Sequence, residues 1–390
     1  MENDFLLSII KADTLQQDQI EDLKNKAKNI SSKKFEKYLI TRNMYPFVYQ
    51  KVQELKLPIS LNKNNALYDK FKRNRISILI GEINCLFKEN NIPVLFLKGM
   101  AYEYLINNKK THRKTGDIDI LVPVKYLKKA VYLLYDKGFN TYCSNAPNIQ
   151  IEIEDSLKSP TRHVIMSDGQ CKIEVHRQFH YYGKHLITDT NESDAYFNSF
   201  FKNHVTITNN EIQEIPTLDL CDSMMLICNH AFRAIKLDDI MKSSSYVIKY
   251  YIDVRQNAKL IQEQKLWNEL YKRADNYNYR LAIGTLLMQI NEILNWHSKE
   301  ATALFVTPEI LKYKDHINWG TETLFPIGVW KKPLIDRVFH YTLNDYELSK
   351  ELLHISHDCK NESIKIVLNN DREKGFEIAC EQICKAGAVV

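Results

Sequence analysis

The chain has 390 residues, of which 44% are hydrophobic and 26% charged, a composition typical of a globular protein with two or three domains. Glycine and proline are scarce, at 11 and 10 residues, which favours a helix-rich architecture over a β-sandwich or a β-barrel. The net charge of +5, from 53 basic and 48 acidic residues, is too close to neutral to indicate nucleic-acid binding by itself.

The eight cysteines form no CxxC pair, and the nearest two, Cys380 and Cys384, have no second pair of ligands beside them. A cysteine-based zinc site is therefore not expected. The first residues, MENDFLLSIIKAD, place two acidic residues before a short apolar run, which is not the pattern of a signal peptide. No apolar run approaches the roughly 18 residues that span a bilayer, so we expect a cytoplasmic protein with reduced thiols and no membrane partner.

Residues 1–90 are predicted to be helical. Apolar residues recur at helical spacing over 35–55, with an interruption at Pro46, and again over 76–87. The NKNN run at 62–65 predicts a loop between these two stretches.

Strands and helices interleave over residues 91–216, which predicts an α/β or α+β unit. The expected elements are a strand over 93–97, a helix over 100–106, a strand over 117–122, a helix over 127–135, and hairpins over 163–176 and 205–215. The segment 107–116 is predicted to be a polar, basic loop.

From residue 217 the helical period returns. Helices are predicted over 218–235, 246–261, 267–274, 281–296, 346–353 and 376–386. The expected organisation is an N-terminal helical region (1–90), a central core (91–216) and a C-terminal helical domain (217–390).

Asp117 and Asp119 stand one residue apart in the segment TGDIDILV, a predicted strand. Because side chains alternate between the faces of a strand, both carboxylates project from one face, while Ile118 and Ile120 point to the other, into a core. Two adjacent carboxylates repel each other unless a cation lies between them. The pair is therefore a candidate metal site, and its oxygen ligands suit Mg²⁺ or Mn²⁺.

A third acidic residue, Glu174, lies in the segment KIEVHR and shares a strand face with His176. Enzymes that transfer nucleotides with Mg²⁺ usually need a third carboxylate. The alternation matches that around the aspartates, so we expect the two strands to lie side by side with their acids aligned. His176, and His163 on the preceding strand, are candidate nucleotide-binding residues, with an ordinary structural role as the alternative.

Lys98 and Gly99 end one predicted strand and open a helix, where backbone N–H groups and the helix dipole favour an anion. Glycine lets the backbone approach a ligand closely, and Lys98 or Arg113 could neutralise a phosphate. Arg113 stands among several basic residues, so the alternative for it is a solvated loop.

The segments LKG at 97–99, RKTGDID at 113–119 and IEVH at 173–176 resemble the polymerase-β-like nucleotidyltransferase superfamily. Within it, the chain is most similar to an uncharacterised bacterial nucleotidyltransferase family with the pattern LKG, R-x-x-x-DIDLLV and a later hydrophobic-acid-hydrophobic-His strand. The AbiEii-type toxin nucleotidyltransferases have a similar R-x-T-x-D-x-D segment. The resemblance implies an α+β fold in which a mixed sheet with flanking helices forms the nucleotidyltransferase core.

By this resemblance, Asp117 and Asp119 coordinate Mg²⁺ and the triphosphate of an NTP. Glu174 takes the third carboxylate position, where a base could deprotonate the acceptor hydroxyl. Lys98 and Gly99 occupy the place of the superfamily's Gly-Ser phosphate-binding turn. The chain departs from the pattern because no serine follows Gly99 and because the third acid is glutamate rather than the commoner aspartate.

The implied activity is that of a Mg²⁺-dependent nucleotidyltransferase. It would move a nucleoside monophosphate from an NTP to a hydroxyl or phosphate acceptor, a small molecule or a peptide, and release pyrophosphate. Two alternatives stay open. One is a toxin-like enzyme acting on RNA, which the basic segment 109–114 supports, and the other is a non-catalytic nucleotide-binding regulator, because the Gly-Ser turn is missing.

Overall fold

The computed structural model describes residues 2–12, 16–107, 115–141, 153, 157, 163–178, 190–208, 214–236, 247–277, 279–312, 314–318, 326–338 and 346–348. These residues form two compact units. The first takes the described residues up to 226 together with 256–264, and the second takes those of 227–255 and those from 265 onward.

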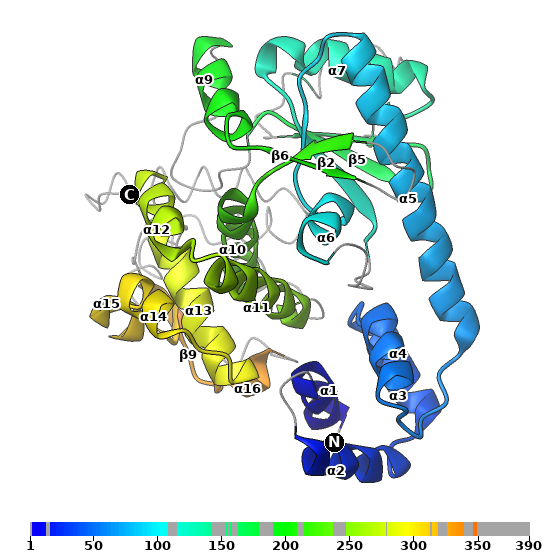
Figure 1. The fold of residues 1–390 in the computed structure, drawn as a ribbon, viewed down its shortest axis with the longest axis vertical. Helices are drawn as coiled ribbons and strands as arrows, with labels where there is room; N and C mark the ends of the chain where they lie inside the picture. The colour runs from blue at the N-terminus through cyan, green and yellow to red at the C-terminus, as the bar shows by residue number, and fades with distance from the viewer. Residues whose placement is uncertain are drawn as a thin grey trace. The chain divides into compact units, whose positions relative to one another are not determined.

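The first unit begins with five helices: α1 (Glu2–Lys11), α2 (Gln17–Lys28), α3 (Ser32–Thr41), α4 (Tyr45–Glu54) and α5 (Lys63–Glu89). Pro46 lies in the first turn of α4, where its missing N–H costs no helical hydrogen bond, so the expected interruption is the boundary between α3 and α4. Asn62 caps α5 by accepting a hydrogen bond from the Asn64 N–H at 3.0 Å. Figure 1 shows α5 as one continuous helix, against which α4 packs.

A seven-stranded mixed sheet follows, in the order β3-β4-β5-β2-β1-β7-β6. Its strands are β1 (Leu95–Phe96), β2 (Asp117–Leu121), β3 (Asn140–Thr141), β4 (His163–Ser167), β5 (Lys172–His176), β6 (Val205–Thr208) and β7 (Glu214–Thr217). The pairs β2–β5 and β1–β7 are parallel, and the other neighbours in the sheet are antiparallel. Both predicted hairpins, β4–β5 and β6–β7, are confirmed.

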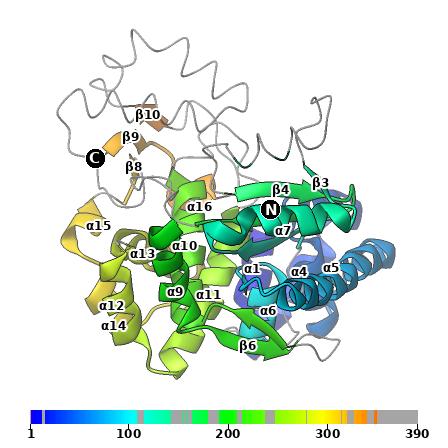
Figure 2. The ribbon, with the colours of Figure 1, turned by 90° about the horizontal axis from the view of Figure 1, so that it is seen from above.

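The apolar residues that alternate with the acids of β2 and β5 form the core of the sheet. Ile118, Ile120, Ile173 and Val175 belong to one buried cluster with residues of α5 and of α7 (Val124–Asp136). Figure 2 shows α7 beside β4, which it contacts. The described part of this region also holds the helices α6 (Met100–Asn107) and α9 (Thr190–Phe201). Since side chains alternate along each strand, the acids project from the opposite face of β2 and β5.

Two long helices, α10 (Leu220–Lys236) and α11 (Val247–Glu263), contribute residues to both units. The second unit continues with α12 (Trp267–Asn276), α13 (Arg280–Leu294), α14 (Lys299–Phe305), α15 (Pro308–Lys312) and α16 (Leu334–Arg337). It also holds a three-stranded antiparallel sheet in the order β10-β9-β8, made of β8 (His316–Asn318), β9 (Pro326–Trp330) and β10 (Tyr346–Leu348). Among the described residues, no helix has both the length and the apolar character needed to cross a bilayer.

The α+β fold is confirmed by this mixed sheet and its flanking helices. The helix predicted over 346–353 is wrong at its start, because Tyr346–Leu348 forms β10 and pairs with residues 328–330. A short apolar run has no clear period, so its secondary structure depends on the partner that packs against it. The rest of that prediction and the helix predicted over 376–386 lie outside the described residues. The boundaries after residues 90 and 216 stay predictions.

Candidate active site

The two acid-bearing strands lie side by side, as the alternation predicted. In the parallel β2–β5 pair, Asp119 is the direct partner of Glu174, and Asp117 is the partner of Lys172. Residues that are paired across neighbouring strands project from the same face of a sheet. Asp117, Asp119 and Glu174 therefore share one face, and the expected alignment of the acids is confirmed.

Asp119 is buried, with 2% of its surface exposed, and it has two nitrogen neighbours. Its Oδ1 atom lies 3.0 Å from Lys98 Nζ and 3.0 Å from His176 Nε2. Its Oδ2 atom is buried and has no hydrogen-bond partner among the described residues. Burial raises the pKa of Asp119 to about 6; Lys98 lowers it, while Glu174 and Asp117 raise it further.

Glu174 has the opposite electrostatic behaviour. Burial acts to raise its pKa, but the hydrogen bond with His176 and the charges of Lys98, His176 and His163 outweigh burial and hold the pKa well below its usual value. Its Oε2 atom lies 3.4 Å from His176 Nε2. Because the pKa of Asp119 is raised and that of Glu174 is lowered, the negative charge of this pair of carboxylates lies preferentially on Glu174.

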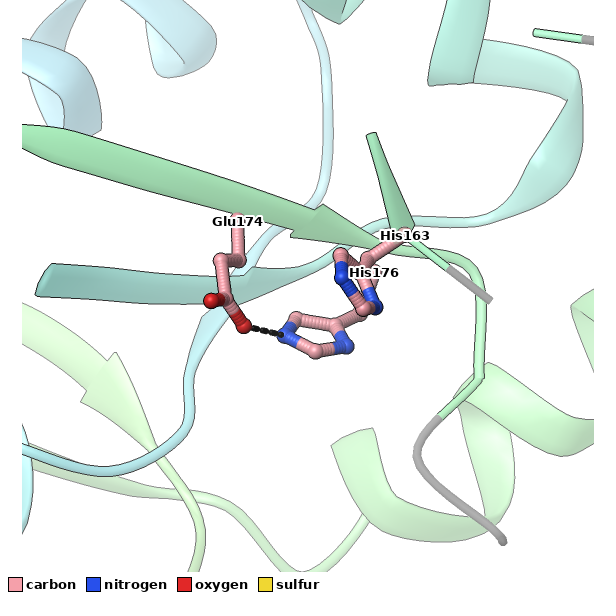
Figure 3. Close-up of side chains that lie close together, drawn as sticks. All are labelled: His163, Glu174 and His176. Atoms are coloured by element: carbon pink, nitrogen blue, oxygen red, sulfur yellow. Dashed lines mark ion pairs between the residues drawn. The ribbon is translucent and has the colours of Figure 1, made fainter. Parts of the chain in front are cut away.

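The two histidines lie opposite each other on the β4–β5 hairpin. His163 is the direct antiparallel partner of His176, and their ring centroids are 4.9 Å apart. Figure 3 shows both rings beside the Glu174 side chain. One ligand atom from each of these three residues lies within 4.8 Å of the others, a separation that a metal ion could bridge.

The Lys98–Gly99 turn brings the helix α6 to the acids. A hydrogen bond from the Leu97 N–H to the Asp119 carbonyl, 3.0 Å long, continues the β1–β2 ladder and holds the turn next to Asp119. Gly99 has φ +62°, and a Cβ there would lie 3.2 Å from Thr115 Cγ2 and 3.5 Å from the Asp117 carbonyl oxygen. Only glycine adopts this left-handed conformation without strain. The first turn of α6 therefore begins against the strand that carries the acids.

The structure brings together most of the predicted site residues. Lys98, Asp119, Glu174, His163 and His176 are linked by the contacts described above, with Gly99 beside them. Asp117 lies on their face of the sheet, while Arg113 lies outside the described residues.

One residue of the site, Thr115, was missed in the sequence. It is buried beside the Gly99 turn, and its hydroxyl has no hydrogen-bond partner among the described residues. The available signal was a hydroxyl residue two positions before Asp117, inside the RKTGDID segment.

The sequence model of a family described as "uncharacterised nucleotidyltransferase" matches residues 29–295, which is more than half of the chain. The chain belongs to this family. It is therefore a nucleotidyltransferase, and a nucleotide is one of its substrates. The match spans every candidate site residue from Lys98 to His176. Membership of the polymerase-β-like superfamily and the relation to the AbiEii-type toxins stay predictions.

Among solved structures, this nucleotidyltransferase is similar to the crystal structure of an antigenic nucleotidyltransferase-like protein from Paracoccidioides brasiliensis. The identity is 13%, the TM-score is 0.32, and the similarity covers 60% of this chain and 97% of that chain. A similarity this low carries no argument about the fold or the site. No curated protein matches the chain.

Proposed function

We propose that this protein moves a nucleoside monophosphate from an NTP to a hydroxyl or phosphate acceptor, a small molecule or a peptide, and releases pyrophosphate. A bond forms between the acceptor oxygen and the α-phosphorus. The bond from the α-phosphorus to the oxygen that bridges it to the β-phosphate breaks, pyrophosphate leaves with that electron pair, and a hydroxyl acceptor releases its proton to solvent. The observation that carries the proposal is the pairing of Asp119 with Glu174 on the face that also holds Asp117 and Lys98.

The residues present fit a Mg²⁺ (or Mn²⁺) ion held by Asp117, Asp119 and Glu174. All three offer carboxylate oxygens, which are the ligands that these ions prefer. Asp119 Oδ2 is buried with no hydrogen-bond partner among the described residues, so it is available as a ligand. When bound, the ion supplies positive charge to the phosphate oxygens and to the developing charge of the leaving group.

The Lys98–Gly99 turn is proposed to hold the phosphates. The first N–H groups of α6 have no helical acceptor and can donate hydrogen bonds to phosphate oxygens. Lys98, 3.0 Å from Asp119, neutralises that carboxylate and lies within reach of an anion placed at the turn. The superfamily's phosphate-binding turn has a serine after its glycine, and no serine follows Gly99 here. The buried Thr115 hydroxyl beside the turn is a candidate for the phosphate contact of that serine.

The pKa directions favour different roles for the two facing acids. A general base works best when its pKa is near the working pH. The pKa of Glu174 is held far below that range, so its permanent negative charge suits a cation ligand better than a base. Burial raises the pKa of Asp119 to about 6, and a cation that neutralises the site stabilises its ionised form. His163 and His176 are proposed to orient Glu174 and to approach the phosphates.

Transfer of label from α-phosphate-labelled NTPs, in the presence of Mg²⁺ and a cell extract, tests the reaction. We expect the unsubstituted protein to label an acceptor and release pyrophosphate. Asp117→Ala or Asp119→Ala should abolish both, because each removes a carboxylate ligand from the acid face, the face of the sheet that carries Asp117, Asp119 and Glu174. Asp22→Ala is the control, since Asp22 is exposed and pairs with Lys26 on α2. If both site variants keep full activity, the proposed mechanism is wrong.

The same experiment identifies the acceptor class. Label on a small molecule or a peptide supports the proposal as stated, whereas label on RNA supports the toxin-like alternative. The basic segment 109–114, on which that alternative depends, lies outside the described residues. A steep decrease of tRNA affinity with salt would be a second sign of an RNA acceptor.

A further inference from the structure

We propose that His163, Glu174 and His176 bind a late first-row transition-metal ion, with Zn²⁺ as its representative. The donor set of this site differs from that of the all-carboxylate magnesium site. Glu174 belongs to both sets, so the two sites share this one side chain.

The pairing of β4 with β5 explains why these three side chains converge. His163 and His176 face each other across the two antiparallel strands, and Glu174 precedes His176 by two residues, which places it on the same face. Figure 3 shows the carboxylate and the two rings turned toward one another. The strands of a central sheet hold such positions more rigidly than loops do.

The separations are close to those that a bound ion requires. One ligand atom from each residue lies within 4.8 Å of the others, and Glu174 Oε2 is 3.4 Å from His176 Nε2. Zinc ligands lie about 2.0–2.2 Å from the ion, so two ligands are at most about 4 Å apart. Shifts of under about 1 Å in the side chains would therefore complete the coordination.

The chemistry of the donors selects the type of ion. Imidazole nitrogens favour zinc and the neighbouring late transition metals, whereas Mg²⁺ prefers oxygen ligands only. Two imidazoles and one carboxylate are also the ligand number of an open zinc site, which leaves a position for water or a phosphate oxygen. Asp119 Oδ1 lies 3.0 Å from His176 Nε2, the same nitrogen that faces Glu174, so Asp119 is a further carboxylate beside this donor set.

Zinc binding to the full chain, stripped of metal with a chelator, tests the inference in the absence of nucleotide and Mg²⁺. We expect one tightly bound Zn²⁺ per chain in competition with a fluorescent zinc chelator. His163→Asn and Glu174→Gln should each weaken zinc binding at least about tenfold, since even the loss of a residue that only orients a metal ligand commonly costs about 10–100-fold. Co²⁺ serves as a spectroscopic probe, and its visible absorption in the protein should weaken in both variants.

The matched control is His204→Asn, because His204 is a partly buried histidine of the same unit that stacks on Phe201 instead of facing an acid. Its zinc affinity should equal that of the unsubstituted protein. Absence of zinc binding, or equal zinc affinity in all three variants, would overturn the inference. Circular dichroism checks folding, and if His163→Asn unfolds, Glu174→Gln decides the outcome.

This experiment separates the inference from the proposed function. Zinc binding without any transfer of nucleotide would refute the proposed reaction and leave the zinc site standing. Nucleotide transfer with Mg²⁺, but no zinc binding, would refute the zinc site and leave the proposed reaction standing.

Discussion

Asp119 lowers the stability of the folded protein and at the same time serves the chemistry of the site. Its carboxylate is buried on the acid face, and burial raises its pKa to about 6, with Lys98 as the opposing charge. Because this pKa lies above the unfolded value of 3.8, the ionised form destabilises the folded protein, and the free energy of unfolding falls as the pH rises from 3.8 towards 6. A cation bound at the site would reverse this cost.

The variant Asp119→Asn tests both consequences. It keeps the shape of the side chain but removes the buried charge, so the free energy of unfolding of the metal-free protein at neutral pH should rise, by up to about 3 kcal/mol. Transfer of labelled nucleotide should be lost, because the amide is a poor ligand for Mg²⁺. Urea unfolding and the transfer assay measure the two effects.

A lower free energy of unfolding in Asp119→Asn would contradict the cost of burying the charge. Retained transfer would contradict the role of Asp119 in the reaction. Asp22→Asn, an exposed substitution on α2, should change neither quantity.

At the scale of elements, the turn between β4 and β5 determines where Glu174 and the two histidines lie. Asp168 Oδ1 accepts hydrogen bonds from the N–H groups of Gln170, at 2.8 Å, and Cys171, at 2.7 Å. The Arg75 guanidinium of α5 donates to the other carboxylate oxygen. Asp168 therefore closes the turn and links it to α5. This contact stabilises the register of β4 and β5, in which His163 pairs with His176.

The variant Asp168→Asn should lower the free energy of unfolding in a pH-dependent way. Burial opposes ionisation, but the two backbone donors and Arg75 outweigh it and hold the pKa of Asp168 below its usual value. Its stabilising contribution is therefore present above the unfolded pKa and is lost as the pH falls through the folded one. We expect a loss of about 1–2 kcal/mol at neutral pH that shrinks in acid.

Urea unfolding at several pH values measures this difference between Asp168→Asn and the unsubstituted protein. A difference that is the same at neutral and acid pH would show that the charge of Asp168 is not responsible. The exposed pair of Lys26 with Asp22 supplies the comparison, since Asp22→Asn should change stability by under about 1 kcal/mol at every pH.

At the scale of the whole molecule, each of the two units has its own buried core. The first is built around the seven-stranded sheet, and the second around α13, which buries most of its length. Gly284 on α13 shows how tightly the second core is packed. A Cβ at this position would lie 2.2 Å from the Phe305 carbonyl oxygen and 2.5 Å from Ile310 Cδ1. The Phe305 backbone cannot shift far enough to make room for a Cβ, so glycine is required where α13 meets the end of α14.

The variant Gly284→Ala should therefore destabilise the second unit by about 1–3 kcal/mol or more, through overpacking. Hydrogen exchange should become faster in α13 and α14 and stay unchanged in α7, which belongs to the first core. Glu292→Ala is the control on the same helix, because Glu292 is exposed. Equal exchange rates in Gly284→Ala and the unsubstituted protein would show that the α13–α14 contact is looser than described.

The local features of this protein could be predicted from its sequence because they depend on neighbouring residues. The alternation in DIDIL and KIEVH predicted which side chains face the core, and helical spacing predicted α7, the four helices from α10 to α13 and the second half of α5. The loop predicted over 62–65 was wrong, because Asn62 caps α5 and the helix begins at Lys63. The Lys98–Gly99 turn before α6 was recognised in the same way. A strand has a period of two residues and a helix one of 3.6, so short segments reveal both.

The alternation already indicated that the two acid-bearing strands lie side by side, but the tertiary structure alone decided their direction and register and the other contacts of the site. The parallel pairing of Asp119 with Glu174, the contact of Lys98 with Asp119, and the place of Thr115 against Gly99 join residues that are far apart or on different elements. The strand β10 was missed for the same reason, since its partner strand determines its conformation. Alternation showed that Asp119 and Glu174 each face away from a core. Only the packing of the sheet placed one directly opposite the other, because strand order and register depend on contacts across the whole core.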